Sequence, residues 1–249
     1  MIQERNQERK KFVSYIESRI EENNNLYARF HLGSFVGGQA LTIANALRRT
    51  LLAEIPAFVI TRVEIDGVNH EFATLPGIHE SILNIVLNLK GMVLVGQNLN
   101  LFSPSMQEFS AALDVRGPRI VTANDIKFPS ELAPLVPSHH IATLNSTGEL
   151  NLNLTIQYVD PLNFKLESKE NLNTFSPELI LDTIPKPVKQ VNFGIHQMPI
   201  QGNDEYISFE IWTDGSISPK EALGYALEKL TRIFYDFTRF NKNSSNSLF

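Results

Sequence analysis

The protein has 249 residues, with 22 Lys and Arg against 27 Asp and Glu, and a net charge of −5. This length fits one large domain or two modest ones, and the 43% of hydrophobic residues can form a buried core, which excludes global disorder. The negative charge excludes a whole-chain positive field for nucleic-acid phosphates, so we do not expect the chain to bind DNA or RNA on its own.

The first 25 residues are predicted to form a helical extension. Phe12, Val13, Ile16 and Ile20 recur at helical spacing among charged residues, which gives one narrow apolar stripe. An asparagine triplet then ends the pattern. We interpret this segment as a solvated helix, with docking of its stripe on another surface as the alternative.

A strand and a helix are expected next. Over residues 26–32 apolar side chains alternate with Tyr27, Arg29 and His31, and this period of two predicts a half-buried strand. Glycines then punctuate a loop before a predicted helix over residues 42–55. The proline that follows ends this helix, because proline disfavours helical geometry in the residue before it.

The middle of the chain is predicted to be rich in sheet. β-branched residues over 58–65 favour a strand, and a 3.6-residue apolar period over 78–90 predicts a second helix. Between residues 93 and 158, short apolar runs alternate with turn-forming clusters, as in a lobe built of short strands. Residues 160–186 are polar and contain three prolines, which indicates a connection out of that lobe.

The last third is predicted to contain a strand pair and a long helix. Residues 188–195 and 206–212 read as strands joined by a turn-forming segment, hence as an antiparallel pair. Ser218 and Glu221 form a capping box around Pro219, so a helix should begin there.

The apolar residues of this last helix, up to residue 237, fill an arc of roughly 140° with every charged residue outside it. An arc of that width indicates contact with more than one surface. Residues 241–249 are rich in Asn and Ser, and we expect them to be a mobile tail.

Arg48 and Arg49 are an anomaly on the predicted helix 42–55. Arg48 is spaced by three, four or seven residues from apolar neighbours, which places it within the apolar stripe. Burial of an unpaired guanidinium would cost several kcal/mol. Arg48 must therefore meet an acceptor either inside this fold or on a partner chain, and the spacing leaves both possibilities open.

No residue pattern typical of catalysis, cofactor binding or metal binding is present. The chain has no cysteine, and Gly37 and Gly38 lack the residues that would complete a phosphate loop or a dinucleotide motif. His139 and His140 would point to opposite faces of a strand, so we interpret them as solvated loop residues. No apolar run is long enough to cross a bilayer. We therefore expect no cofactor, no metal site and no membrane contact.

Several segments carry a resemblance to a known family: TIANALRRTLL at 42–52, VEIDGV at 63–68, HEFAT at 70–74, GIHE at 77–80, RGP at 116–118, HIATL at 140–144 and IWTDGSISPKEA at 211–222. In this order they resemble the α subunit of bacterial-type, multisubunit DNA-directed RNA polymerase, and its plastid-encoded members in particular. The resemblance extends over residues 26–238 and its motifs are specific.

The resemblance implies an α+β fold with two lobes. Residues 26–56 and 176–240 would form a discontinuous dimerisation domain, and residues 57–175 an inserted second domain. The N-terminal extension, 1–25, begins before the family's usual start. Residues 241–249 do not resemble the C-terminal DNA-binding domain of many relatives, so we expect no such domain here and DNA contact only through the assembled complex.

The resemblance also implies a role without catalysis. Such a chain dimerises and gathers the β and β′ subunits, which carry the active site, so the implied partners are a second α chain, β and β′. The implied location is the plastid (chloroplast stroma or nucleoid), with the bacterial cytoplasm as the alternative. The implied contact residues are Arg48, Arg49, Leu52, His70, Glu71 and Phe72 for β, Lys90 for β′, and Leu47, Leu51, Leu223, Leu227, Leu230 and Phe234 for the dimer.

The sequence departs from the family pattern at two positions and leaves three alternative functions open. Ala28 and Ala44 stand where the family usually has glycine, changes that a strand and a helix should tolerate. The chain could instead be the equivalent assembly subunit of an archaeal or eukaryotic polymerase, a dimeric enzyme of unknown reaction, or a free-standing regulator of transcription. A pocket lined by groups with shifted pKa values would favour the enzyme, and salt-dependent DNA binding the regulator.

Overall fold

The computed structural model describes residues 11–96, 108–162, 178–198 and 204–245. The chain divides into two compact units. Unit 1 comprises Met1–Ile55 and Val188–Phe249, and unit 2 comprises Pro56–Pro187. Sheets and helices occur in both units, which confirms the predicted α+β class with two lobes.

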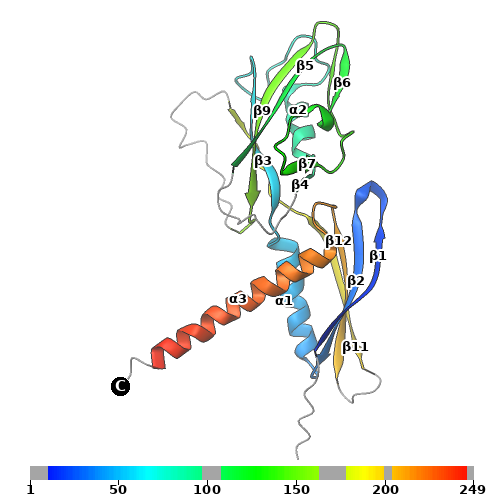
Figure 1. The fold of residues 1–249 in the computed structure, drawn as a ribbon, viewed down its shortest axis with the longest axis vertical. Coiled ribbons are helices and arrows are strands. Elements are labelled where there is room, and N and C mark those ends of the chain that lie inside the picture. Colours follow the sequence, from blue (N-terminus) through cyan, green and yellow to red (C-terminus); the bar gives the residue numbers. More distant parts are fainter. Residues whose placement is uncertain (1–10, 97–107, 163–177, 199–203, 246–249) are drawn as a thin grey trace, which may run out of the picture. The chain divides into compact units, whose positions relative to one another are not determined.

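Unit 1 is built on a four-stranded antiparallel sheet (Figure 1). Its strands, in spatial order, are β1 (Phe12–Ile20), β2 (Leu26–Phe35), β12 (Glu205–Thr213) and β11 (Val188–Gln197). The pairing of β11 with β12 confirms the predicted antiparallel pair. Two helices pack against this sheet: α1 (Gln39–Ala53) contacts β11 and β12, and α3 (Pro219–Ser245) contacts β2 and β12.

One face of the sheet forms the core of unit 1. The alternation predicted for β2 is confirmed, because Phe30 and Leu32 are buried in this core while Arg29 lies on the opposite face and pairs with Glu210 of β12 at 2.9 Å. The largest core side chains come from β2, β12 and both helices: Phe30, Leu47, Leu51, Phe209 and Leu223.

The predicted N-terminal helix is wrong, because residues 12–20 form the edge strand β1. β1 pairs with β2, and its register shifts between Tyr15 and Glu17. Such a bulge inserts an extra residue, Ile16, and breaks the period of two, so that apolar residues on either side of it fall at helical spacing. The Tyr15 ring meets the Phe30 ring edge-on, with centroids 5.4 Å apart, a contact that the strand pairing provides.

Local sequence sets where α1 and α3 begin. Gly38 precedes α1 with a left-handed φ of 86°, which glycine adopts without strain, so the helix starts at Gln39 rather than at residue 42. Before α3, the Glu221 amide donates to Ser218 Oγ and the Ser218 amide donates to the Glu221 carboxylate, each at 3.2 Å, which confirms the capping box. α3 continues to Ser245, into the segment expected to be a mobile tail.

Unit 2 contains a second antiparallel sheet, two short strand pairs and the helix α2 (Ile82–Lys90), which confirms the predicted sheet-rich lobe. The sheet has the order β10 (Glu178–Ile180), β3 (Ala57–Ile65), β9 (Glu149–Val159) and β5 (Glu108–Arg116). The short pairs are β4 (Leu94–Gly96) with β7 (Leu132–Pro134), and β6 (Arg119–Thr122) with β8 (His140–Leu144).

The domain boundaries expected from the sequence differ from those of the structure. β10 pairs with β3, so residues 178–180 belong to unit 2, and the chain returns to unit 1 only at Val188 rather than at residue 176. In the same way β1 is part of the unit 1 sheet and not a separate extension. The expected boundary at residues 175 and 176 falls within residues 163–177, which lie outside the described ranges.

Two adjacent histidines fasten both ends of α2. Before the helix, the Glu80 carboxylate accepts a hydrogen bond from the Thr143 amide at 2.6 Å and lies 2.9 Å from His140 Nε2. In its last turn, the Asn88 carbonyl oxygen lies 2.8 Å from His139 Nε2. The interpretation of these histidines as solvated loop residues is confirmed only in part: His139 lies in a loop and His140 is exposed, but His140 begins β8 and both rings have partners. Their partners, Asn88 of α2 and Glu80 just before it, lie 51 and 60 residues away in the sequence, which sequence spacing could not show.

The contacts of Glu80 shift its ionisation. Burial alone would raise the pKa of Glu80, but the hydrogen bonds from Thr143 and His140 outweigh burial and the pKa is lowered from its ordinary value. A carboxylate whose pKa is lowered by folding stabilises the fold above its unfolded pKa, and this contribution is lost as the pH falls through the folded pKa.

We therefore expect Glu80→Gln to destabilise the protein near pH 7 and to have much less effect at an acidic pH below the lowered pKa of Glu80, where the wild-type carboxylate is protonated. Chemical denaturation followed by circular dichroism at both pH values measures the difference. Glu131→Gln, at an exposed glutamate, is the matched control. An effect of Glu80→Gln that is equally large at both pH values would contradict this assignment.

Candidate functional site

The outward face of α1 carries two arginines and two leucines. Leu41, Arg48, Arg49 and Leu52 are all exposed, and we call them the α1 patch. The opposite, buried stripe of the helix consists of Ala40, Ala44, Leu47, Thr50 and Leu51. Arginine is enriched in protein interfaces, and the exposed leucines beside it add apolar area that a partner could bury.

The prediction that Arg48 lies within the apolar stripe is wrong. Leu41, Asn45 and Leu52, which share its side of the helix, are all exposed. The buried stripe is centred one residue earlier, on Leu47. Across the described ranges, no acceptor within the fold pairs with Arg48. Because the Arg48 side chain is exposed, water can satisfy its guanidinium, so the argument from burial that required an acceptor no longer applies.

A buried carboxylate joins the end of α1 to α3. The Glu54 side chain is 4% exposed, and Lys229 Nζ of α3 lies 3.4 Å from its Oε2. Arg49 Nη1 lies 3.9 Å from Glu54 Oε1, although the Arg49 side chain is 78% exposed. Among the described residues the buried Oε2 accepts no hydrogen bond, so the nearby ammonium is its main compensation. One arginine of the α1 patch is thereby linked electrostatically to α3.

Three residues predicted for contact with β lie in unit 2, in the loop between β3 and α2. His70, Glu71 and Phe72 are exposed. The Phe72 residue is 75% exposed, which leaves most of its ring in water. Burying such a ring releases a large apolar area, so Phe72 is a candidate anchor for a second protein.

The outward face of α2 carries further apolar residues that the sequence analysis did not single out. Leu83 and Leu87 are exposed and four residues apart, and the exposed Lys90 follows at the end of the helix. Ile85 and Leu89 are buried on the other face. The sequence contained a signal for this surface: Leu83 and Leu87 do not fit the apolar stripe formed by Ile82, Ile85 and Leu89.

The six residues predicted for a dimer contact fall into two groups. Leu47, Leu51 and Leu223 are buried in the core of unit 1, so their side chains pack within the chain itself. The other three offer apolar surface: Leu227 and Leu230 are half-buried and Phe234 is exposed.

The second half of α3 extends past the unit 1 sheet (Figure 1). All side chains over 231–238 are exposed. They include Ile233, Tyr235 and Phe237, which were not among the predicted contact residues. A helix whose apolar residues continue beyond its own core requires another surface to cover them.

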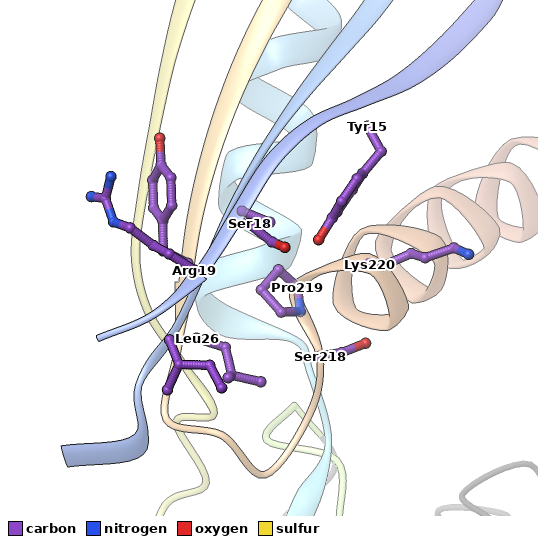
Figure 2. A pocket seen from close by; sticks show the side chains of 10 residues that line it. Tyr15, Ser18, Arg19, Leu26, Ser218, Pro219 and Lys220 are labelled. Atoms are coloured by element: carbon purple, nitrogen blue, oxygen red, sulfur yellow. The ribbon is translucent and has the colours of Figure 1, made fainter. Parts of the chain in front are cut away.

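A cavity of about 450 Å³ lies between β1 and the start of α3 (Figure 2). Its walls include Tyr15, Ser18 and Ile20 of β1, Leu26 of β2 and Pro219 of α3. We call it the β1 pocket.

The ionisable groups of the β1 pocket do not favour the enzyme alternative. A hydrogen bond to Glu21 raises the pKa of Arg19, and burial raises the pKa of Tyr27. Both side chains therefore keep their protons near neutral pH and neither can act as a general base or as a nucleophile.

Two further properties were checked over the parts of the chain that the structure describes. No three His, Cys, Asp or Glu side chains gather there in a way that could hold a metal ion. None of the helices described is both long enough and apolar enough to cross a membrane.

Comparison with known proteins identifies the family of this chain. A family model described as the RNA polymerase Rpb3/RpoA insert domain matches residues 63–159, within unit 2. The DNA-directed RNA polymerase subunit alpha of Chlorella vulgaris is 38% identical over 94% of this chain and 98% of its own length. The proteins of the same name from Cyanidium caldarium and Synechococcus elongatus are 34% and 33% identical over 94% of this chain and 74% of their own lengths. The resemblance inferred from the motifs is confirmed, and the chain belongs to the family of DNA-directed RNA polymerase α subunits.

Proposed function

We propose that this chain forms a homodimer on which the β and β′ subunits of the polymerase assemble. As an α subunit it is part of a nucleotidyltransferase complex and is not itself catalytic. The observation that carries the platform role is the apolar second half of α3, which the core of unit 1 leaves uncovered. In this proposal unit 1 is the dimerisation domain and unit 2 is the inserted domain.

The dimer contact is centred on α3. Leu227, Leu230 and Phe234 provide apolar surface at helical spacing, and a symmetric pair of chains buries the same surface twice. Burial of apolar area contributes roughly 25 cal/mol per Å², so several exposed aromatic and leucine side chains together favour association strongly. Leu47, Leu51 and Leu223 contribute indirectly, because they belong to the core that fixes α1 and α3 in place within each chain.

The β subunit binds the α1 patch together with the loop that carries His70, Glu71 and Phe72. Arg48 and Arg49 present ten guanidinium N–H donors in fixed planes, and Leu52 adds an apolar anchor. Arg49 Nη1 lies 3.9 Å from Glu54 Oε1, and with the side chain 78% exposed its guanidinium stays accessible to a partner.

The β′ subunit binds the outward face of α2. Lys90 provides a charge at the end of the helix, and Leu83 and Leu87 provide the apolar area beside it. His139 and His140 hold both ends of this helix, which keeps its outward face in one position.

The location we propose is the plastid, with the bacterial cytoplasm as the alternative. Support comes from the relatives, which include α subunits of the algae Chlorella vulgaris and Cyanidium caldarium and of cyanobacteria. The same relatives argue against the archaeal or eukaryotic counterpart. Because the net charge is −5, we propose that DNA is contacted only through the assembled complex.

Phe234→Glu should convert the dimer into a folded monomer, because it places a charge in the proposed contact at an expected cost of about 3–5 kcal/mol. The side chain is exposed in the single chain, so circular dichroism should be unchanged. Light scattering measures the mass, and Leu230→Glu should act in the same direction. Phe72→Glu is the control, because it changes a phenylalanine of similar exposure in unit 2, 75% against 67% for Phe234. A Phe234→Glu variant as dimeric as the wild type would show that the seam lies elsewhere.

Arg49→Ala and Leu52→Ala should weaken capture of β without affecting the dimer. Truncation of an anchor at an interface centre typically costs about 2 kcal/mol or more, which is about a thirtyfold loss of affinity. Co-purification of β with tagged α, titrated over concentration, measures it. The matched control is Arg116→Ala, since the side chain of Arg116 is also 78% exposed but lies at the end of β5, outside the residues proposed to bind β. Equal losses from Arg49→Ala and Arg116→Ala would refute the α1 patch as the β site.

A further inference from the structure

We propose that the end of α3 from each chain of the dimer docks on β1 of its partner, with Phe237 entering the partner's β1 pocket. This inference rests on the proposed homodimer and adds to it a second contact, away from the α3 seam. The occupant is therefore a second copy of this chain.

The first observation is an uncovered apolar surface on β1. Val13, Tyr15, Ser18 and Ile20 pair with Leu32, Phe30, Ala28 and Leu26 of β2, whose side chains face the core of unit 1. These β1 residues therefore face the side of the sheet on which the helices pack.

The helices do not cover that edge of the sheet. α1 contacts β11 and β12, whereas α3 contacts β2 and β12. As a result Val13, Tyr15 and Ile20 remain exposed, and Ile20 is 74% exposed. The β1 pocket opens between Tyr15 and Ser18 of β1 and the first turn of α3 (Figure 2). The apolar side of β1 is therefore left uncovered by α1 and α3.

The second observation is an apolar stripe on α3 that matches this surface in kind. Ala226 is buried and Leu230 half-buried on the side of α3 that packs on unit 1. Ile233 and Phe237 follow at helical spacing and continue the same stripe, yet both are exposed, Phe237 by 73%. The stripe needs a sheet beneath it, and the chain's own sheet lies under only the first half of the helix (Figure 1).

Symmetry places the two surfaces together. In a two-fold dimer with antiparallel α3 helices, each contact of one chain is repeated by the other. If the axis passes near Glu228, between the seam residues Leu227 and Leu230, then Phe237 of one chain lies level with Pro219 of the other. Pro219 lines the β1 pocket. The half of α3 beyond the axis then lies over the partner's β1, about 14 Å from the axis at 1.5 Å per residue.

The test uses the absence of cysteine from the chain. The double variant Ile20→Cys, Phe237→Cys should form a disulfide between chains under mild oxidation, seen as a dimer on non-reducing electrophoresis. Phe237→Cys alone should not, because the two copies of residue 237 would be about 27 Å apart. The pair Ile120→Cys, Phe237→Cys is the control, since Ile120 is exposed in unit 2.

A double-mutant cycle supplies a second measurement that needs no cross-link. Tyr15→Ala and Phe237→Ala should each weaken the dimer by at least about tenfold, and the double variant should be weaker than wild type by clearly less than the product of the two factors. A dimer that persists by light scattering, with no cross-link above the control and with factors that multiply, would overturn this inference but leave the homodimer intact. A wild-type chain that is monomeric would overturn both.

Discussion

The four-stranded sheet of unit 1 has one apolar face, and the rest of the unit follows from the need to cover it. α1 covers β11 and β12, and the first half of α3 covers β2 and β12. Packing of the two helices on the sheet buries Leu47, Leu51 and Leu223 in the core of unit 1. What remains outward on α1 is a face with two arginines, and what remains on α3 is a second half with no core beneath it. The surfaces that we assign to partners are thus the parts of each helix that folding of the single chain does not use.

The buried Glu54 carboxylate, where α1 meets α3, links the proposed β contact of unit 1 to its proposed dimer contact. Glu54 is buried where α1 ends, and its carboxylate is compensated by Lys229 of α3 and, more weakly, by Arg49 of the α1 patch. Removing Lys229 would leave the buried Glu54 charge poorly compensated, whereas the exposed Arg49 contributes little to it. The helix proposed for dimerisation therefore supports the position of a residue proposed to bind β. A platform subunit has to keep its contact surfaces rigid relative to its dimer seam, and this ion cluster contributes to that within unit 1.

Much of the fold could be predicted wherever one local signal dominates. The alternation in β2, the antiparallel pair of β11 and β12, and the Ser218 capping box were all confirmed, because each depends on neighbours in sequence. The failures arose where a distant contact decides. The bulge beside Tyr15 disguised β1 as a helix, and the roles of His139 and His140 depend on α2. For Arg48, the failure arose because α1 carries leucines on both its buried and its exposed face. Their spacing alone fits a buried stripe centred on either Leu47 or Arg48. Family motifs identified the α subunit, but they could not show that Phe237 and the β1 pocket would both be uncovered.

The central claim is that the polymerase needs this chain for assembly and not for chemistry. Reconstitution tests it directly: purified β and β′ are combined with and without this chain, and the β–β′ complex and promoter-dependent RNA synthesis are both measured. We predict that a stable β–β′ complex and RNA synthesis appear only when this chain is present, and that this chain alone makes no RNA. Equal assembly of β with β′ in its absence would contradict the platform role, and RNA synthesis by the chain alone would contradict the absence of catalysis.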